Sequence, residues 1–193
     1  VGSEMCIRES PIALMKAMKN PVEVENIKRA HIKDGVAMCK FIYWLKKNVP
    51  LGNVSEISAA EKLVEFRAQM DGFLDQSFAP IFGYGEHGAI IHYSATEETN
   101  VVMKDKGLCL IDTGAHYYDG TTDVTRTVVL GELTKEEKEA FTIVLKGNLN
   151  LANTTFVYGT TGANIDCVAR RPLWEKGMDF NHGTGHGLSL IHI

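Results

Sequence analysis

The stretch "GLCLIDTGAHYYDGTTDVTRTVVL", residues 107–130, decides the fold that the sequence predicts. Residues 107–114 and 122–130 are two strand-like runs. Between them Asp119-Gly120 is a strong signal for a tight turn. We therefore predict an antiparallel hairpin with its turn centred near Tyr118.

Two carboxylates interrupt this hairpin. With a turn near Tyr118, Asp112 in the first strand would lie beside Asp123 in the second. Neighbouring carboxylates repel each other, and one pKa rises strongly unless a cation lies between them. A divalent metal ion would satisfy the pair, and so would a structural arrangement in which Arg126 neutralises one carboxylate. The hairpin alone leaves both interpretations open.

The segment "HGTGHG", residues 182–187, holds two of the seven histidines of the chain. Its three glycines argue against a helix and favour a strand or loop whose backbone approaches a ligand closely. We interpret His182 and His186 as functional, against the alternative of a flexible loop with chance histidines. His92 lies in "AIIHYSA" (89–95), which predicts a short buried strand, so a core histidine is the alternative to a catalytic one there.

Amphipathic helices are predicted on both sides of the hairpin. They are marked by Pro21 at a helix start, by capping boxes at Ser58–Glu61 and Thr134–Glu137, and by an apolar stripe that includes Val144, Leu145 and Leu149. Their expected spans are 21 to about 47, 58 to about 70, 134 to about 152, and about 162 to 174. The predicted class is α+β, an antiparallel sheet backed by helices.

Composition excludes some classes of partner. The 193 residues carry a net charge of −4, without a block of Lys and Arg, which argues against nucleic acid. The sequence has no apolar run of the length that a membrane span needs. The four cysteines form no C-x-x-C motif, so we expect buried free thiols and a cytoplasmic protein.

Three stretches together, "AIIHY", "LIDTGAHYYDGTTDVTRT" and "HGTGHG", resemble the M24 metallopeptidases of pita-bread fold. Among these, the sequence is most similar to the cytosolic Xaa-Pro aminopeptidases. The resemblance runs from about Pro11 to Gly187 and implies a pita-bread fold whose second half is incomplete in this chain. The pair "DGTTDVTRT" and "HGTGHG" is its most specific part.

The resemblance implies a dinuclear centre with two divalent metal ions, most commonly Mn²⁺. Asp112, Asp123 and His186 match metal ligands of the family, and an oxygen-rich site with one imidazole suits manganese. His92 and His182 match histidines that bind substrate and handle protons. The implied reaction removes the N-terminal residue from a peptide substrate whose second residue is proline. A homodimer of the full-length protein is left open.

The same resemblance divides the chain into a lead-in segment (1–20) from a missing N-terminal region, a partial M24 catalytic domain (21–187) and a tail (188–193). The family has two glutamate ligands after "HGTGHG", and "LSLIHI" supplies neither. We hypothesise that residues 188–193 are translated from a sequencing adapter and that the fragment itself is inactive. A non-catalytic M24 module that binds peptides or proteins, and another M24 enzyme such as a prolidase, are the alternative functions.

Overall fold

The computed structural model describes residues 11–186, so the predicted tail at 188–193 and the first half of the lead-in segment lie outside the described residues. The chain splits into two compact units. The first contains residues 1–131 together with 186–193, and the second contains residues 132–185. Each unit is described by itself.

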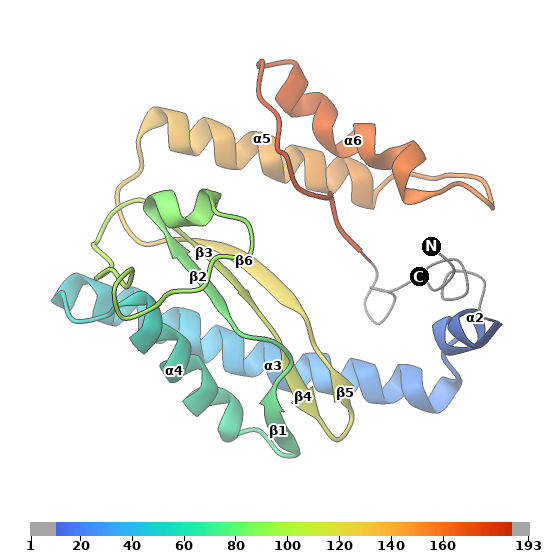
Figure 1. The fold of residues 1–193 in the computed structure, drawn as a ribbon, viewed down its shortest axis with the longest axis horizontal. Coiled ribbons are helices and arrows are strands. Elements are labelled where there is room, and N and C mark those ends of the chain that lie inside the picture. Colours follow the sequence, from blue (N-terminus) through green and yellow to red (C-terminus); the bar gives the residue numbers. More distant parts are fainter. Residues whose placement is uncertain (1–10, 187–193) are drawn as a thin grey trace. The chain divides into compact units, whose positions relative to one another are not determined.

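In the described residues of the first unit, the chain forms three α-helices and six strands (Figure 1). Its helices are α2 (Pro11–Ala17), α3 (Pro21–Asn48) and α4 (Glu56–Ala68), with short 3₁₀ helices η1 (Val49–Leu51) and η2 (Gly85–Ala89). Its strands are β1 (Phe73–Gln76), β2 (Ile81–Tyr84), β3 (Leu108–Thr113), β4 (Ala115–Tyr117), β5 (Gly120–Thr121) and β6 (Val124–Val129).

The predicted hairpin is confirmed, and it contributes to two antiparallel sheets. The strand orders are β1-β4-β5 and β2-β3-β6. One arm of the hairpin consists of β3 and β4, and the other consists of β5 and β6. The chain passes from one sheet to the other at Gly114 in the first arm, and between Thr121 and Val124 in the second.

The register of the hairpin differs from the prediction by two residues. Tyr117 pairs with Gly120, so the turn is centred between positions 118 and 119, and Asp112 pairs with Thr125 rather than with Asp123. The reason is that Gly120, with φ 157°, is a paired strand residue directly after the turn. A shift of two residues keeps a side chain on the same face of its strand.

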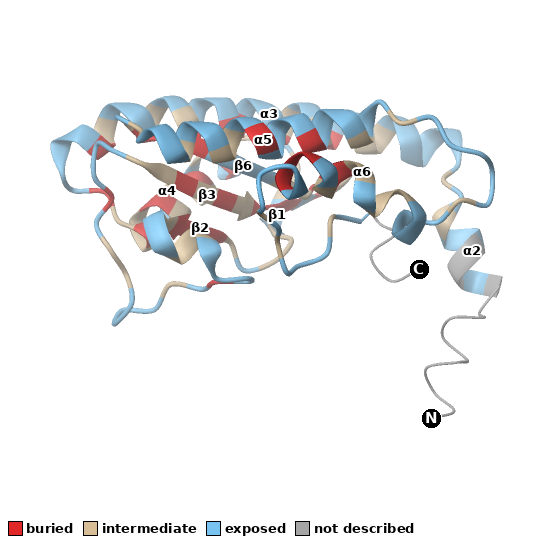
Figure 2. Cartoon of the chain, turned by 90° about the horizontal axis from the view of Figure 1, so that it is seen from above, coloured by how far each residue is buried: buried red, intermediate tan, exposed pale blue. Residues whose placement is uncertain are grey.

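The core of the first unit lies between α3, α4 and the sheet β2-β3-β6. Figure 2 shows buried residues along α3, α4 and β3, among them Phe41, Leu63 and Ile111, each at most 1% exposed. A smaller cluster forms around Ala30 and Tyr117. The two apolar clusters cover one continuous face of α3.

The first residues of α3 and α4 can be compared with the helix starts that the sequence predicts. Helix α3 begins at Pro21 as predicted, and Asn20 caps it together with Glu23. Helix α4 begins at Glu56, earlier than expected, because Ser55 is the capping residue and Ser58 its N3 partner. The predicted capping box at Ser58–Glu61 was therefore wrong by one helical turn.

Residues 89–95 do not form the predicted buried strand. Ile90 and Ile91 are 53% and 52% exposed, and only Tyr93 of this apolar stretch is buried. The physical reason lies in the backbone of His92, whose positive φ of 54° interrupts an extended conformation in the middle of this stretch.

The second unit is built from α5 (Lys135–Ala152) and α6 (Gly162–Trp174). The predicted capping box at Thr134–Glu137 is confirmed. The helices approach closely at Gly147, where an added Cβ would lie 2.3 Å from the Ala169 carbonyl oxygen. On α5, Ile143 and Gly147 are buried, whereas Val144, Leu145 and Leu149 of the predicted stripe are exposed.

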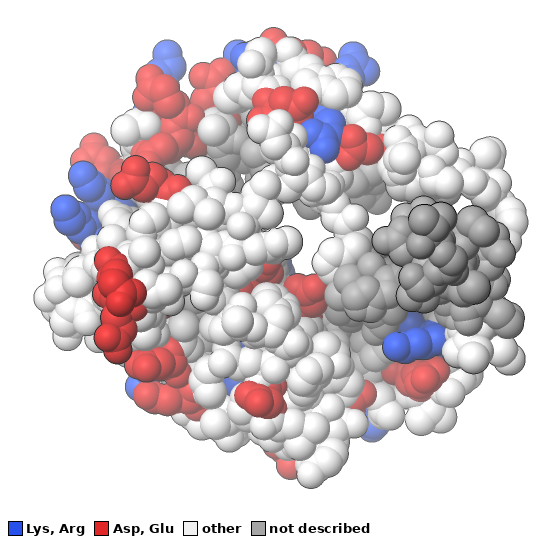
Figure 3. Space-filling model, viewed as in Figure 1, with Lys and Arg blue, Asp and Glu red and all other residues white. Residues whose placement is uncertain are grey.

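Charged side chains of both signs are distributed over the surface. Figure 3 shows acidic side chains spread over the visible face, with basic ones in small groups among them. In the part of the chain that is described, no helix has the length and apolarity needed to span a membrane. Cys109 is a buried free thiol whose pKa is raised to about 12 by burial and by the charge of Glu56. Cys39 and Cys167 are exposed, so the expectation of burial was wrong for them.

Candidate metal centre

The carboxylate pair lies where the hairpin passes between its two sheets. Asp112 is the second-to-last residue of β3, and Asp123 lies directly before β6. Thr125 Oγ1 donates a 2.8 Å hydrogen bond to Asp112 Oδ1. Burial raises the pKa of Asp123, and the negative charge of Asp112 raises it further. The two carboxylates therefore lie close enough to repel each other.

His186 acts on the pKa of Asp123 in the direction opposite to Asp112. Its Nε2 lies 3.5 Å from Asp123 Oδ2, and it lowers the pKa of Asp123. Arg126 pairs opposite Ile111, so its side chain points to the other face of the strand from Thr125 and Asp112. It donates to the carbonyl oxygen of Thr125. The geometry thus places His186 beside Asp123 and places Asp123 within the electrostatic influence of Asp112, and it does not support neutralisation by Arg126.

We call Asp112, Asp123 and His186 the candidate metal centre. Two carboxylates with one imidazole form a donor set that suits a hard or borderline divalent cation. The mutual repulsion expressed in the raised pKa of Asp123 would be relieved by such a cation. Within residues 11–186, no three His, Cys, Asp or Glu side chains are already gathered closely enough to hold a metal ion. The chemistry of the donors fits a divalent metal.

His92 is exposed, so its interpretation as a core histidine was wrong. It has φ 54°, and it is the only residue other than glycine with positive φ in the described part of the chain. Such a backbone persists only where the surroundings hold it. The next residue, Tyr93, is buried and donates from its hydroxyl to Glu56 Oε2 at 3.0 Å. His92 is thus an exposed imidazole on a constrained backbone.

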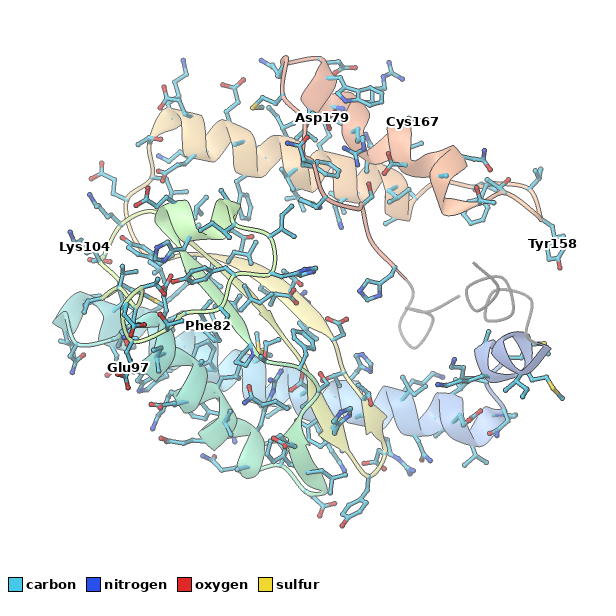
Figure 4. All side chains as sticks on the ribbon, viewed as in Figure 1. Phe82, Glu97, Lys104, Tyr158, Cys167 and Asp179 are labelled. Carbon is cyan, nitrogen blue, oxygen red and sulfur yellow. The ribbon has the colours of Figure 1, made fainter. Side chains whose placement is uncertain are left out.

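His182 belongs to the second unit, and it lies in a loop as the glycines predicted. Its ring stacks on Phe180 with 4.6 Å between the ring centroids. Arg170 of α6 donates to the carbonyl oxygens of Phe180, at 2.6 Å, and His182, at 3.1 Å. Arg170 also pairs with Asp179, which Figure 4 shows beside α6. A hydrogen bond from Arg170 of α6 therefore holds the backbone of the exposed His182.

Sequence reasoning missed a group of buried polar residues beneath the carboxylate pair. Asp34 and Arg67 form an ion pair that is 0% exposed on both sides. A signal for it exists in the sequence: Asp34 lies four residues after Ala30 and four before Met38, on the buried face of α3. Arg67 holds the equivalent place on α4, four residues after Leu63. A charge at an apolar position on each of two neighbouring helices predicts a buried pair.

The sequence matches one protein family and several of its curated members. The sequence model of metallopeptidase family M24 matches residues 25–192. The chain is 46% identical over 176 residues to Xaa-Pro aminopeptidase ApepP of Drosophila melanogaster, covering 91% of this chain and 29% of that protein. It is 42% identical over 204 residues to aminopeptidase P1 of Lotus japonicus, covering 94% of this chain and 31% of that protein. The chain thus spans about three tenths of the length of these relatives.

Solved structures give the same relationship. The X-prolyl aminopeptidase of Caenorhabditis elegans, described as a cytosolic enzyme with a di-nuclear active site, matches with a TM-score of 0.86 and 40% identity over 92% of this chain and 29% of that one. The Xaa-Pro dipeptidase of Bacillus anthracis matches with a TM-score of 0.80 and 29% identity over 93% of this chain and 48% of that one.

Proposed function

This chain belongs to metallopeptidase family M24, and on that premise we propose that the protein containing it is an Xaa-Pro aminopeptidase. The enzyme would hydrolyse the bond after the N-terminal residue of a peptide whose second residue is proline. The α+β class and the pita-bread fold of the family are as the sequence predicted. The observation that carries the proposal is that Asp123 lies 3.5 Å from His186 and feels the charge of Asp112, inside the matched region.

Asp112, Asp123 and His186 would supply three of the ligands of two divalent metal ions, for which we propose Mn²⁺, and the two glutamates of the family pattern would complete the set. The di-nuclear active site of the Caenorhabditis elegans relative supports two ions. Bound in this way, the ions would supply activation of a water molecule and polarisation of the scissile carbonyl. The protein's own contribution is to hold two repelling carboxylates close together on a rigid hairpin.

His92 and His182 are the proposed substrate-side histidines. Both are exposed, so both imidazoles are accessible to a peptide and can exchange protons with it. The constrained backbone of His92 and the stacking of His182 on Phe180 would fix the directions of the two rings. Proline in the second position has no backbone N–H, so selectivity would come from a pocket shaped for its ring.

We also propose a cytoplasmic location, which the description of the Caenorhabditis elegans relative as cytosolic supports. A prolidase that cleaves Xaa-Pro dipeptides is the second candidate function. It is favoured by the likeness to the Bacillus anthracis Xaa-Pro dipeptidase. The two functions differ in the length of the peptide that the site accepts.

The test is hydrolysis by the protein that contains this chain, with Mn²⁺ and after chelation. An Xaa-Pro-Xaa tripeptide and an Xaa-Pro dipeptide are the substrates. We expect manganese-dependent release of the first residue from the tripeptide, loss of activity in Asp123→Asn, and activity in Asp119→Asn, a control in the turn of the same hairpin. Cleavage of the dipeptide alone would indicate a prolidase, and binding without cleavage would indicate a non-catalytic module.

A further inference from the structure

Four polar side chains are completely buried beneath the candidate metal centre. Asp34, Arg67, Thr113 and Thr122 are each 0% exposed. Arg67 Nε donates to Asp34 Oδ1 at 2.7 Å and Nη2 donates to Oδ2 at 3.1 Å, which is a bidentate ion pair between α4 and α3. We call this pair the core ion pair.

The arginine of the core ion pair holds the chain directly after Asp112. Its Nη1 donates to Thr113 Oγ1 at 2.6 Å and to the carbonyl oxygen of Gly114 at 3.0 Å. These residues end β3 and begin the passage to β4. The position of Asp112 along the hairpin is thus tied to the guanidinium group.

The aspartate of the core ion pair holds the chain directly before Asp123. Thr122 Oγ1 donates to Asp34 Oδ2 at 2.9 Å, and the same hydroxyl accepts a hydrogen bond from the Ala115 backbone N–H at 3.0 Å. The two passages also touch, since a Cβ added at Gly114 would lie 2.1 Å from the Thr122 carbonyl oxygen. One ion pair therefore connects both carboxylate-bearing segments at their closest approach.

We propose that the core ion pair is a positioning device for the candidate metal centre, and that Thr122 and Thr113 transmit its geometry to Asp123 and Asp112. This inference rests on the proposed function. A core that required only stability would be served as well by apolar side chains, because a buried ion pair adds little net stability over them. Apart from the Tyr117 hydroxyl, which donates to Asp34 Oδ1 at 3.3 Å, the contacts of this pair go to the chain next to the two carboxylates. Partners behind metal ligands set the ligand directions and hence the affinity for metal.

The test compares three threonine variants in the protein that contains this chain. Thr122→Val keeps the volume and removes the hydroxyl, Thr122→Ser keeps the hydroxyl, and Thr127→Val changes an exposed threonine of β6 as a matched control. The dissociation constant of Mn²⁺ is measured by titration calorimetry well below the melting temperature, which is measured separately on the metal-free protein. We expect Thr122→Val to weaken Mn²⁺ binding by about 10- to 100-fold, and Thr122→Ser and Thr127→Val to bind as the unsubstituted protein does.

Thr113→Val is a second variant that leaves the core ion pair in place, in case Thr122→Val does not fold. It removes the acceptor of Arg67 Nη1, and weaker Mn²⁺ binding is expected again. A lowered melting temperature with unchanged Mn²⁺ affinity in both variants would overturn the inference, because the network would then only stabilise the core. In that result the unsubstituted protein still binds Mn²⁺ and cleaves Xaa-Pro peptides. Failure of the unsubstituted protein to bind Mn²⁺ would overturn the proposed function itself.

Discussion

Among the described residues of the first unit, two carboxylates are completely buried, those of Asp34 and Glu56, and their surroundings differ. Asp34 faces a fully buried guanidinium group, that of Arg67. Glu56 accepts hydrogen bonds from the Tyr84 backbone N–H at 2.8 Å and the Tyr93 hydroxyl at 3.0 Å, and it contacts the partly exposed His87 at 3.0 Å. We call this second group the loop cluster.

The two groups support different parts of the proposed site. The core ion pair joins two helices to the hairpin that carries Asp112 and Asp123. The loop cluster joins the start of α4 to the segment on both sides of His92. Removal of a partner leaves an unpaired buried charge in the first group, whereas in the second it leaves mostly neutral donors. The first group should therefore be the more sensitive to substitution.

Arg67→Met should have the largest effect. It leaves the Asp34 carboxylate buried without its guanidinium partner, and the expected loss of unfolding free energy is about 3–5 kcal/mol. Urea unfolding followed by circular dichroism measures it. The double variant Asp34→Leu/Arg67→Met removes both charges and should recover part of the loss. A single variant as stable as the double one would contradict the account.

Gly114→Ala should have the second largest effect on stability. The added Cβ would meet the Thr122 carbonyl oxygen and Ser77 Oγ, at 2.1 and 2.2 Å, where the hairpin passes between its sheets. Overpacking of this kind costs about 1–3 kcal/mol, which a melting curve detects. Gly35→Ala is the control, since an added Cβ there meets nothing within 4 Å on a helix. It should leave stability unchanged or raise it, and equal losses in both variants would argue against a close passage at Gly114.

Glu56→Gln should have a smaller effect than Arg67→Met. In the variant, an NH₂ group replaces one of the two carboxylate oxygens that accept hydrogen bonds at Glu56. One hydrogen-bond donor then loses its acceptor, at a cost of about 1–2 kcal/mol. Melting curves of Glu56→Gln and of Glu61→Gln, an exposed position on the same helix, give the difference. If Glu56→Gln destabilised the protein as much as Arg67→Met, the contrast between the two groups would be wrong.

Asp119→Asn should have the smallest effect and should depend on pH. Lys33 donates to Asp119 and lowers the pKa of this carboxyl, with Arg29 adding a weaker attraction. Because the folded-state pKa is depressed, the pair stabilises the protein above the unfolded-state pKa of about 3.9. That contribution is lost as the pH falls through the folded-state value. Melting temperatures of the two proteins should differ at neutral pH and converge in acid. A constant difference would show that Asp119 acts through something other than its charge.

Local signals in the sequence predicted much of this structure. The hairpin of residues 107–130, the start of α3 at Pro21 and the capping box at Thr134–Glu137 depend on neighbouring residues alone. The joint position of Asp112 and Asp123 on one part of the hairpin followed from these signals, although the register was two residues off. His186 and its place beside Asp123 came from the resemblance to the family.

Features that depend on distant residues were not predicted. The core ion pair joins positions 33 residues apart in sequence; the helical pattern marks each charge as buried, but the pairing itself depends on how the two helices pack. The sequence 89–95 is apolar enough for a strand, yet the positive φ of His92 interrupts an extended backbone there.

The most direct test of the central claim is the position of manganese in the protein that contains this chain. Crystals soaked in Mn²⁺ would be measured near the manganese absorption edge, and an anomalous difference map would locate the ions. The account predicts peaks bordered by the carboxylates of Asp112 and Asp123, with the imidazole of His186 as a further ligand. Peaks away from Asp123, in a protein that cleaves Xaa-Pro peptides with manganese, would contradict it.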